Sequence, residues 1–228
     1  LIPIVSSSRA ARLICEKWSA NYGYLPDAIV VEGPKAGGHL GFKNEQIEDE
    51  HYSLEHLIPE VVEVARSYAG RKDIPVIAAG GIATGEDIAR FMALGASAVQ
   101  MGSIFVPTEE CDASVEFKQV YLNAHREDIR IIQSPVGMPG RAFDGEFIRN
   151  VAEGKEKPRS CPFHCIKTCD YTKSPYCIIK ALYNAARGNM KKGYAFAGGN
   201  AYLSDRIRSV KEVIEKLKAD FFLSKALL

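Results

Sequence analysis

The sequence lacks a long hydrophobic run, an excess of charge of either sign and a recognisable leader. No stretch approaches the roughly 18 apolar residues that a membrane-spanning helix needs. The 29 basic and 28 acidic side chains leave a net charge of +1, so neither nucleic acid nor an anionic membrane is an expected partner. The chain starts at Leu1 without a basic, apolar signal segment, and we therefore expect a cytoplasmic protein.

The sequence also lacks the spread of cysteines that is typical of a disulfide-stapled secreted domain. Four of the six cysteines fall in one short segment, at Cys161, Cys165, Cys169 and Cys177. This clustering favours a reducing compartment and a local group of thiols. With His164 among them, the thiolates could hold zinc or an iron–sulfur cluster, although the spacing is standard for neither. The alternative is a set of small buried residues that bind no metal.

What the sequence does contain is a strand–helix alternation in its first hundred residues. Four short, nearly continuous apolar runs occupy residues 2–5, 28–31, 75–79 and 98–101, as expected of strands covered on both faces. Helical patterns separate them, with N-cap candidates at residues 6–8 and a capping box formed by Thr84 and Asp87. Pro59 is expected in the first turn of the second helix. This alternation predicts a parallel α/β sheet or barrel.

The pattern changes after residue 109. A helix is predicted over residues 112–125, a strand over 129–133 and a loop over 134–140, followed by the cysteine segment and two more helices. These changes define three predicted regions. They are a half barrel over residues 1–110, a mainly helical insertion or cap with the cysteines over 111–200, and a C-terminal helix packing back on the barrel over 201–228.

Two glycine turns follow successive predicted strands. Gly80 and Gly81 come after the third apolar run, and Gly102 and Ser103 come after the fourth. In a βα barrel, the loops after the last two strands often hold phosphate. Glycine lets backbone N–H groups approach the phosphate, the helix after Thr84 points its positive end toward it, and the hydroxyl adds a donor. One such turn could merely reverse the chain, but two in succession predict a phosphate site.

A histidine lies among glycines in the stretch AGGHLG, residues 36–41, directly after the second apolar run. Packing for stability does not need such flexibility beside His39, whereas close approach of the backbone to a planar ligand does. A lone histidine is usually a satisfied core residue. In this setting we predict a functional role for His39 as an acid–base group or as a partner for an anion.

Three motifs carry a resemblance to a known family: VEG followed by AGGHLG, then PVIAAGGI, then VQMGSIF. In this order and spacing over residues 1–106, the chain resembles the nitronate monooxygenases, formerly called 2-nitropropane dioxygenases, and the related FMN-dependent enoyl-ACP reductases. The resemblance implies a TIM (βα)8 barrel that binds FMN. It also implies that this chain carries only strands 5 to 8, so that the missing N-terminal half or a second copy in a homo-oligomer covers the exposed sheet edges.

The resemblance further implies which residues act. His39 is the implied catalytic residue, and residues 197–200 are similar to a small-residue segment that returns to the flavin. Many relatives carry glutamine where this chain has Glu32, so hydrogen bonding near the flavin is expected to differ. The implied FMN contacts are Glu32, Gly37, Gly38, Gly80, Gly81, Gln100, Met101, Gly102 and Ser103.

The function that we favour from the resemblance is FMN-dependent oxidation of small alkyl nitronates by molecular oxygen. One alternative is a flavin reductase of the enoyl-ACP reductase type that takes hydride from NAD(P)H. A second alternative is a noncatalytic half-barrel fragment that binds phosphate ligands or a partner chain.

Overall fold

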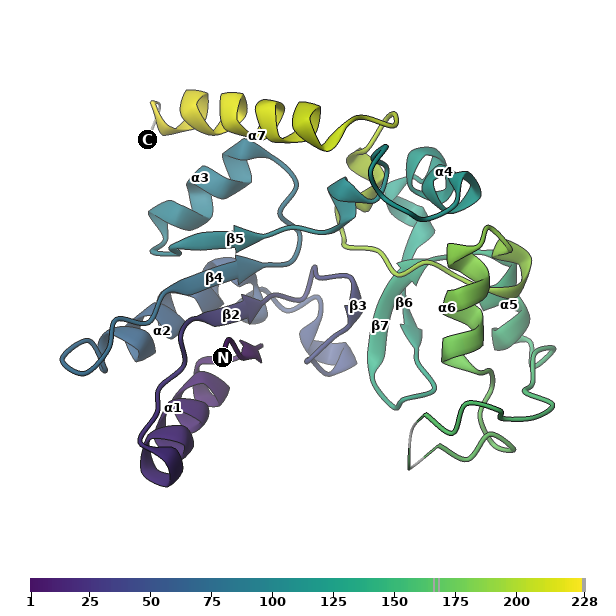
Figure 1. Ribbon diagram of the computed structural model, residues 1–228, viewed down its shortest axis with the longest axis horizontal. Coiled ribbons are helices and arrows are strands. Elements are labelled where there is room, and N and C mark those ends of the chain that lie inside the picture. Colours follow the sequence, from purple (N-terminus) through teal and green to yellow (C-terminus); the bar gives the residue numbers. More distant parts are fainter. Residues whose placement is uncertain (166, 168, 227–228) are drawn as a thin grey trace. The chain divides into compact units, whose positions relative to one another are not determined.

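The chain forms two compact units in the computed structural model, which describes residues 1–165, 167 and 169–226 (Figure 1). Unit 1 contains Leu1–Ala36, Gly41–Gly102 and the chain from Lys211 onward, and unit 2 contains Gly37–Leu40 and Ser103–Val210. Residues 166 and 168 of the predicted cysteine cap, and 227–228 of the predicted C-terminal region, lie outside the described residues. No helix in the described ranges is long and apolar enough to cross a bilayer.

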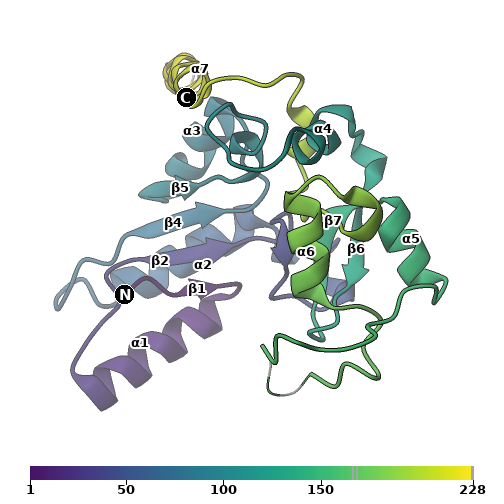
Figure 2. The ribbon, with the colours of Figure 1, turned by 45° about the vertical axis from the view of Figure 1, so that its right-hand side comes forward.

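Unit 1 is built on a parallel sheet with the strand order β1-β2-β4-β5, visible as adjacent arrows in Figures 1 and 2. Helices alternate with these strands along the chain, so the predicted α/β pattern is confirmed. The strands are β1 (Ile4–Val5), β2 (Ile29–Glu32), β4 (Val76–Ala79) and β5 (Ala98–Gln100). The helices are α1 (Ser8–Tyr22), α2 (Leu54–Arg66), α3 (Gly85–Ala93) and α7 (Val210–Lys225).

The helix starts follow local hydrogen-bonding chemistry. The Ser7 hydroxyl caps α1 by accepting the N–H of Ala10 at 3.2 Å, and the predicted capping box of α3 is present. The prediction for Pro59 is wrong, because α2 begins at Leu54 and the proline lies in its interior. Burial of the α2 face that begins at Leu54 extends the helix one turn further toward its N-terminus than the proline signal indicated.

The edges of the sheet in unit 1 are open. β1 is an edge strand whose Ile4 is 58% exposed, and Ile2 just before it is 55% exposed. β5 is the other edge, with Ala98 and Gln100 exposed. The central strands β2 and β4 are largely buried. In the described chain neither β1 nor β5 pairs with a further strand of this sheet, as expected for part of a barrel.

Helix α7 packs directly on the start of α3 within unit 1. A Cβ atom added to Gly85 would lie 2.3 Å from the carbonyl oxygen of Leu217 and 2.3 Å from the backbone nitrogen of Phe221. The two helices therefore meet backbone to backbone at this point, and only glycine permits the approach.

Unit 2 contains an antiparallel sheet with the order β3-β7-β6. The predicted strand over residues 129–133 is present as β6, whereas the predicted loop over 134–140 is wrong at its end, because β7 includes Pro139 and Gly140. The turn-forming residues at its start concealed the strand, whereas pairing with β3 and β6 forms it. The strands are β3 (Gly38–His39), β6 (Ile129–Gln133) and β7 (Pro139–Phe143). The helices are α4 (Val115–Asn123), α5 (Glu146–Ala152) and α6 (Ile178–Ala186).

An aromatic cluster fills the core of unit 2. The rings of Tyr194 and Phe147 are stacked 6.1 Å apart, and the Tyr194 ring also contacts Phe196 at 5.0 Å and Tyr176 at 5.8 Å. The Tyr176 hydroxyl donates a 3.2 Å hydrogen bond to that of Tyr194. Burial raises the pKa of Tyr194 well above its ordinary value, so this core is uncharged.

Candidate functional site

The carboxyl ends of three strands lie in one row in unit 1. The register pairs Glu32 of β2 with Ala79 of β4, and Ala79 with Gln100 of β5. The N–H of Gly33 donates to the carbonyl of Ala79 at 2.9 Å, which extends the ladder by one residue. The predicted contact residues that follow β2, β4 and β5 in unit 1 therefore share one edge of one sheet.

The turn after β4 depends on both of its glycines. Gly80 and Gly81 have φ values of 101° and 76°, a region that side chains rarely tolerate. A Cβ on Gly80 would lie 3.0 Å from the backbone nitrogen of Ala36, and one on Gly81 would lie 2.8 Å from the Cβ of Lys35. The pair therefore has a structural role, because it lets the turn pack against residues 33–36.

The turn after β5 is open by comparison. A Cβ on Gly102 would meet no atom within 4 Å, and the residue is exposed with an ordinary φ. Within the described chain the N–H groups of Gly80 and Gly102 donate no hydrogen bond. Both turns thus offer N–H donors without a partner in the described chain, and the Gly102 turn also has open space beside it, as a phosphate group would need.

The start of α3 is less available to an anion than we expected. The Asp87 carboxylate accepts the N–H groups of Ala83 at 3.0 Å and Thr84 at 3.1 Å, and the Thr84 hydroxyl accepts the N–H of Asp87 at 3.1 Å. The carboxylate also places a negative charge at the positive end of the helix. This helix end therefore offers fewer free N–H donors to an anion than the sequence pattern indicated.

Glu32 is half-buried at the end of β2 and forms no ion pair within the described ranges. Burial raises the pKa of its carboxyl group above the ordinary value, because charge is less well solvated there than in water. Glu32 therefore holds a proton more readily than an exposed glutamate, and in that form its carboxyl group can donate a hydrogen bond.

His39 lies in unit 2, on β3, where it pairs with Gly140 of β7. The structure corrects our placement of this residue at the end of β2, because a separate short strand carries it. Its Nε2 atom is 2.7 Å from the hydroxyl oxygen of the buried Ser134, and its ring centre is 5.1 Å from that of Phe196. Burial lowers the pKa of His39, so the imidazole is neutral at neutral pH.

Ser134 is a candidate site residue that sequence reasoning missed. It opens the turn between β6 and β7, where its carbonyl accepts the N–H of Gly137 at 3.0 Å. Its hydroxyl holds the orientation of a histidine 95 positions earlier. No local pattern marks such a partner, since the contact arises only when β3 pairs with β7.

Gly37, Ser103 and the segment at residues 197–198 converge in unit 2. A Cβ on Gly37 would lie 2.6 Å from the carbonyl carbon of Ala197 and 2.6 Å from the nitrogen of Gly198. The N–H of Gly198 donates to the Ser103 hydroxyl at 3.0 Å, which leaves the hydroxyl proton for another acceptor. Gly38 has a φ of 86° and open space beside it. Three regions that were expected to contact the cofactor thus meet in one unit.

The cysteines of the cap line one small pocket of unit 2, about 30 Å³ in volume. Local desolvation and the neighbouring thiols of Cys161, Cys165 and Cys177 raise the pKa of the exposed Cys169. Among the described residues, no group of three or more His, Cys, Asp or Glu side chains is arranged to hold a single metal ion.

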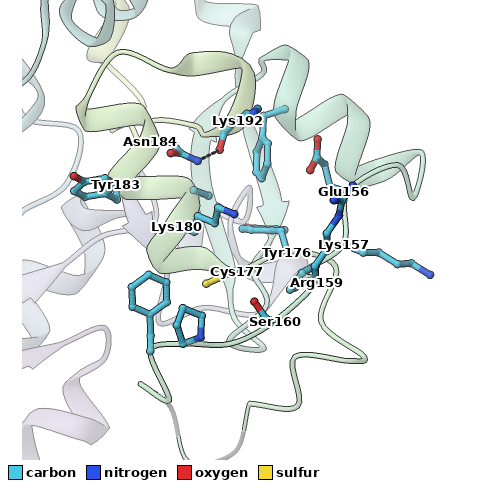
Figure 3. A pocket seen from close by; sticks show the side chains of 15 residues that line it. Glu156, Lys157, Arg159, Ser160, Tyr176, Cys177, Lys180, Tyr183, Asn184 and Lys192 are labelled. Carbon is cyan, nitrogen blue, oxygen red and sulfur yellow. Dashed lines mark hydrogen bonds between the residues drawn. The ribbon is translucent and has the colours of Figure 1, made fainter.

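A larger pocket of about 670 Å³ adjoins the cysteine pocket and was not predicted (Figure 3). Cationic side chains line it at Lys157, Arg159, Lys180 and Lys192, and none of them forms an ion pair in the part of the chain that the structure describes. The side-chain amide of Asn184 donates to the carbonyl of Lys192 at 3.0 Å and fixes one wall. Glu156 also lines the pocket, so four cationic side chains stand against one carboxylate, and this aromatic and mainly cationic lining suits an organic anion.

Comparison with known proteins identifies the relatives of this chain. Residues 1–220 match a protein-family model described as nitronate monooxygenase. A probable nitronate monooxygenase of Staphylococcus aureus is 33% identical over 191 residues, which is 83% of this chain and 52% of that protein. Another from Staphylococcus saprophyticus is 31% identical over 140 residues, covering 60% of this chain and 38% of that protein. The chain spans about half the length, or less, of these curated relatives.

Solved structures show the same partial correspondence. FabK from Thermotoga maritima superposes with a TM-score of 0.72 at 30% identity, covering 99% of this chain and 62% of that one. A nitroalkane oxidase from Streptomyces ansochromogenes superposes with a TM-score of 0.71 at 24% identity, covering 100% and 59%. At that identity the second match shows the fold alone. Both support an α/β fold that corresponds to part of a larger barrel.

Proposed function

The chain belongs to the nitronate monooxygenase family, and on that premise we propose that its polypeptide is an FMN-dependent oxidoreductase that oxidises alkyl nitronates with molecular oxygen. The observation that carries the proposal is the pair of strand-end turns at Gly80 and Gly102, whose N–H groups have no hydrogen-bond partner among the described residues, with open space beside Gly102. In a chain of this family, a phosphate site at the ends of parallel strands supports FMN as the ligand.

FMN, when bound, supplies the electron transfer from substrate to oxygen. The chain's own residues hold and orient it. The N–H groups of Gly80 and Gly102 would bind the phosphate, and the Ser103 hydroxyl would offer its remaining proton as a further donor. Gly38 leaves space beside its backbone for a flat ring. That residues of both units contact one cofactor stays a prediction.

His39 is proposed to bind the anionic nitro group of the substrate. Ser134 fixes the ring through Nε2, so the Nδ1 atom is the one left for substrate. A nitronate has already lost its proton, and a neutral imidazole can donate a hydrogen bond to it or accept a proton from a neutral nitroalkane at Nδ1. The lowered pKa keeps this ring uncharged over the neutral range.

A second candidate function is an NAD(P)H-dependent flavin reductase. The cationic pocket lined by Lys157, Arg159, Lys180 and Lys192 favours it, because the phosphates of a pyridine nucleotide would neutralise these unpaired charges.

The two functions are separated by a steady-state assay on the complete polypeptide. Oxygen consumption with an alkyl nitronate and no pyridine nucleotide supports the proposed function, whereas NAD(P)H oxidation with an enoyl thioester supports the alternative. His39→Asn is expected to lower kcat/KM with the nitronate at least about tenfold. The exposed His56→Asn is the matched control and should leave it unchanged. A colourless protein that binds no added FMN would overturn both enzymatic readings and favour the noncatalytic fragment.

A further inference from the structure

We propose that Cys161, Cys165, Cys169 and Cys177 ligate a [4Fe–4S] cluster in the cap of unit 2. The first observation is spatial: all four thiols line the same small pocket, together with Tyr171 and Tyr176. The two remaining cysteines of the chain, Cys15 and Cys111, do not line it. Four cysteines are the usual ligand set of such a cluster.

Core packing does not explain these cysteines. Cys165 and Cys169 are exposed, and Cys161 and Cys177 are only half-buried, whereas a cysteine that serves as a small apolar residue is among the most buried of side chains. Cys15, which is fully buried in α1, shows that contrast within this chain. The alternative of small buried thiols therefore does not fit the cap.

Short turns, rather than helices or strands, bring the four thiols to one pocket. Between α5 and α6 the described residues form no regular element. His164 has a φ of 43°, and it is the one non-glycine residue with a positive φ in the described ranges. Such a conformation between Cys161 and Cys165 turns the backbone sharply. Further on, the Asp170 carboxylate accepts the N–H of Thr172 at 3.1 Å and shapes the turn after Cys169.

Four cysteines suit a multinuclear cluster as well as one zinc ion. In the described part of the cap no three of the thiols are arranged around a single ion position, so binding of either kind of centre requires the segment to rearrange. In a cubane cluster each iron atom takes one thiolate, so the sulfur ligands lie further apart than the four around a tetrahedral zinc. Loading draws an irregular segment together, because metal binding and local folding are coupled.

The surroundings suit the charge of such a centre. Four thiolates around an iron–sulfur core carry a net negative charge. The adjoining pocket shares Ser160, Tyr176 and Cys177 with the cysteine pocket, and Lys180 and Arg159 lie on its walls (Figure 3). These cations have no ion-pair partner in the described chain and would stabilise the cluster by opposite charge.

The proposed centre is separate from the His39 site. Starting at His39, ring contacts run through Phe196 at 5.1 Å and Tyr194 at 5.0 Å to Tyr176, which lines the cysteine pocket. A packed aromatic core thus lies between the histidine and the thiols. The proposal does not depend on which reaction occurs at His39.

The test is anaerobic purification of the complete polypeptide, followed by reconstitution with ferrous iron and sulfide. We expect about four iron atoms and four sulfide ions per chain, with an electron paramagnetic resonance signal after reduction by dithionite. Cys165→Ala and Cys169→Ala, chosen because both side chains are exposed, should each lose at least half of the bound iron. Cys111→Ala is the matched control and should retain all of it.

Two outcomes would overturn the proposal. One zinc ion per chain without sulfide would replace the cluster by a mononuclear site. Absence of both metals, with four thiols that react rapidly with a thiol reagent in the native protein, would remove the metal site. Thermal unfolding of the iron-free forms of the variants is compared with that of iron-free Cys111→Ala. Equal midpoint temperatures show that a variant that lost iron has lost a ligand and is not misfolded. FMN content and nitronate oxidation are measured on the same samples, so that failure of the cluster proposal can be told apart from failure of the proposed function.

Discussion

Replacing Gly37 by alanine tests the closest backbone contact among the candidate site residues. The added Cβ would lie 2.6 Å from the carbonyl carbon of Ala197 and from the nitrogen of Gly198, and 2.9 Å from the carbonyl oxygen of Ala197. All three neighbours are backbone atoms, which cannot rotate away as a side chain can. To reach a normal separation of about 3.5 Å the two segments must move apart by about 1 Å.

That movement has a cost that can be estimated from its parts. Overpacking costs typically 1–3 kcal/mol, and stretching the 3.0 Å bond from Gly198 to the Ser103 hydroxyl costs about 1 kcal/mol more. We therefore expect Gly37→Ala to lower the free energy of unfolding by about 2–4 kcal/mol.

Urea unfolding of the complete polypeptide measures this change as a lower midpoint at constant slope. Gly70→Ala is the matched control, because its Cβ would meet nothing within 4 Å and its φ is not positive. It should change stability by no more than about 0.5 kcal/mol. Equal midpoints for Gly37→Ala and Gly70→Ala would refute the packing of Gly37 on residues 197–198.

Three further predictions concern the ligand site and pH. Gly102→Ala should leave the free energy of unfolding unchanged, because the space beside Gly102 is open. The same variant should bind FMN about tenfold more weakly in a fluorescence titration, because the added methyl group would occupy space that the phosphate needs. Equal affinity of variant and parent would show that the phosphate does not bind at this turn. Glu32→Gln should raise the free energy of unfolding at pH 7 by about 1 kcal/mol or less and leave it unchanged near pH 4. The reason is that a carboxyl group with a raised pKa in the folded state destabilises the protein only as pH rises through that pKa. An equal gain in stability at both pH values would contradict a raised pKa for Glu32. Because the pKa of His39 is lowered, nitronate turnover should stay constant as pH falls to about 6.5 and decrease only in more acidic solution. Turnover that already decreases between about pH 7.5 and about pH 6.5 would argue against a neutral His39.

Much of unit 1 could be predicted from local sequence. The strands β1, β2, β4 and β5 are short apolar runs, and the caps at Ser7 and Thr84 are hydrogen bonds within three residues. Such signals depend on neighbours in the chain, and they are therefore readable before any tertiary contact exists. Gly80 and Gly81 were also predicted at a strand end, where their positive φ values confirm that the turn needs them.

The candidate site in unit 2 could not be predicted in the same way. The orientation of the His39 ring depends on a hydrogen bond with Ser134, 95 residues away. The need for glycine at position 37 depends on close contact with the backbone of Ala197 and Gly198. β7 begins with residues that locally favour a turn, and only its pairing with β3 and β6 makes it a strand.

By itself, the sequence determined the alternating strands and helices, their caps and the family to which the chain belongs. Only the tertiary structure decided which strand carries His39, what holds its ring, and that four cysteines share a pocket. The physical reason is range: backbone propensity and capping act over a few residues, whereas packing and hydrogen bonds between distant segments exist only after the chain has folded.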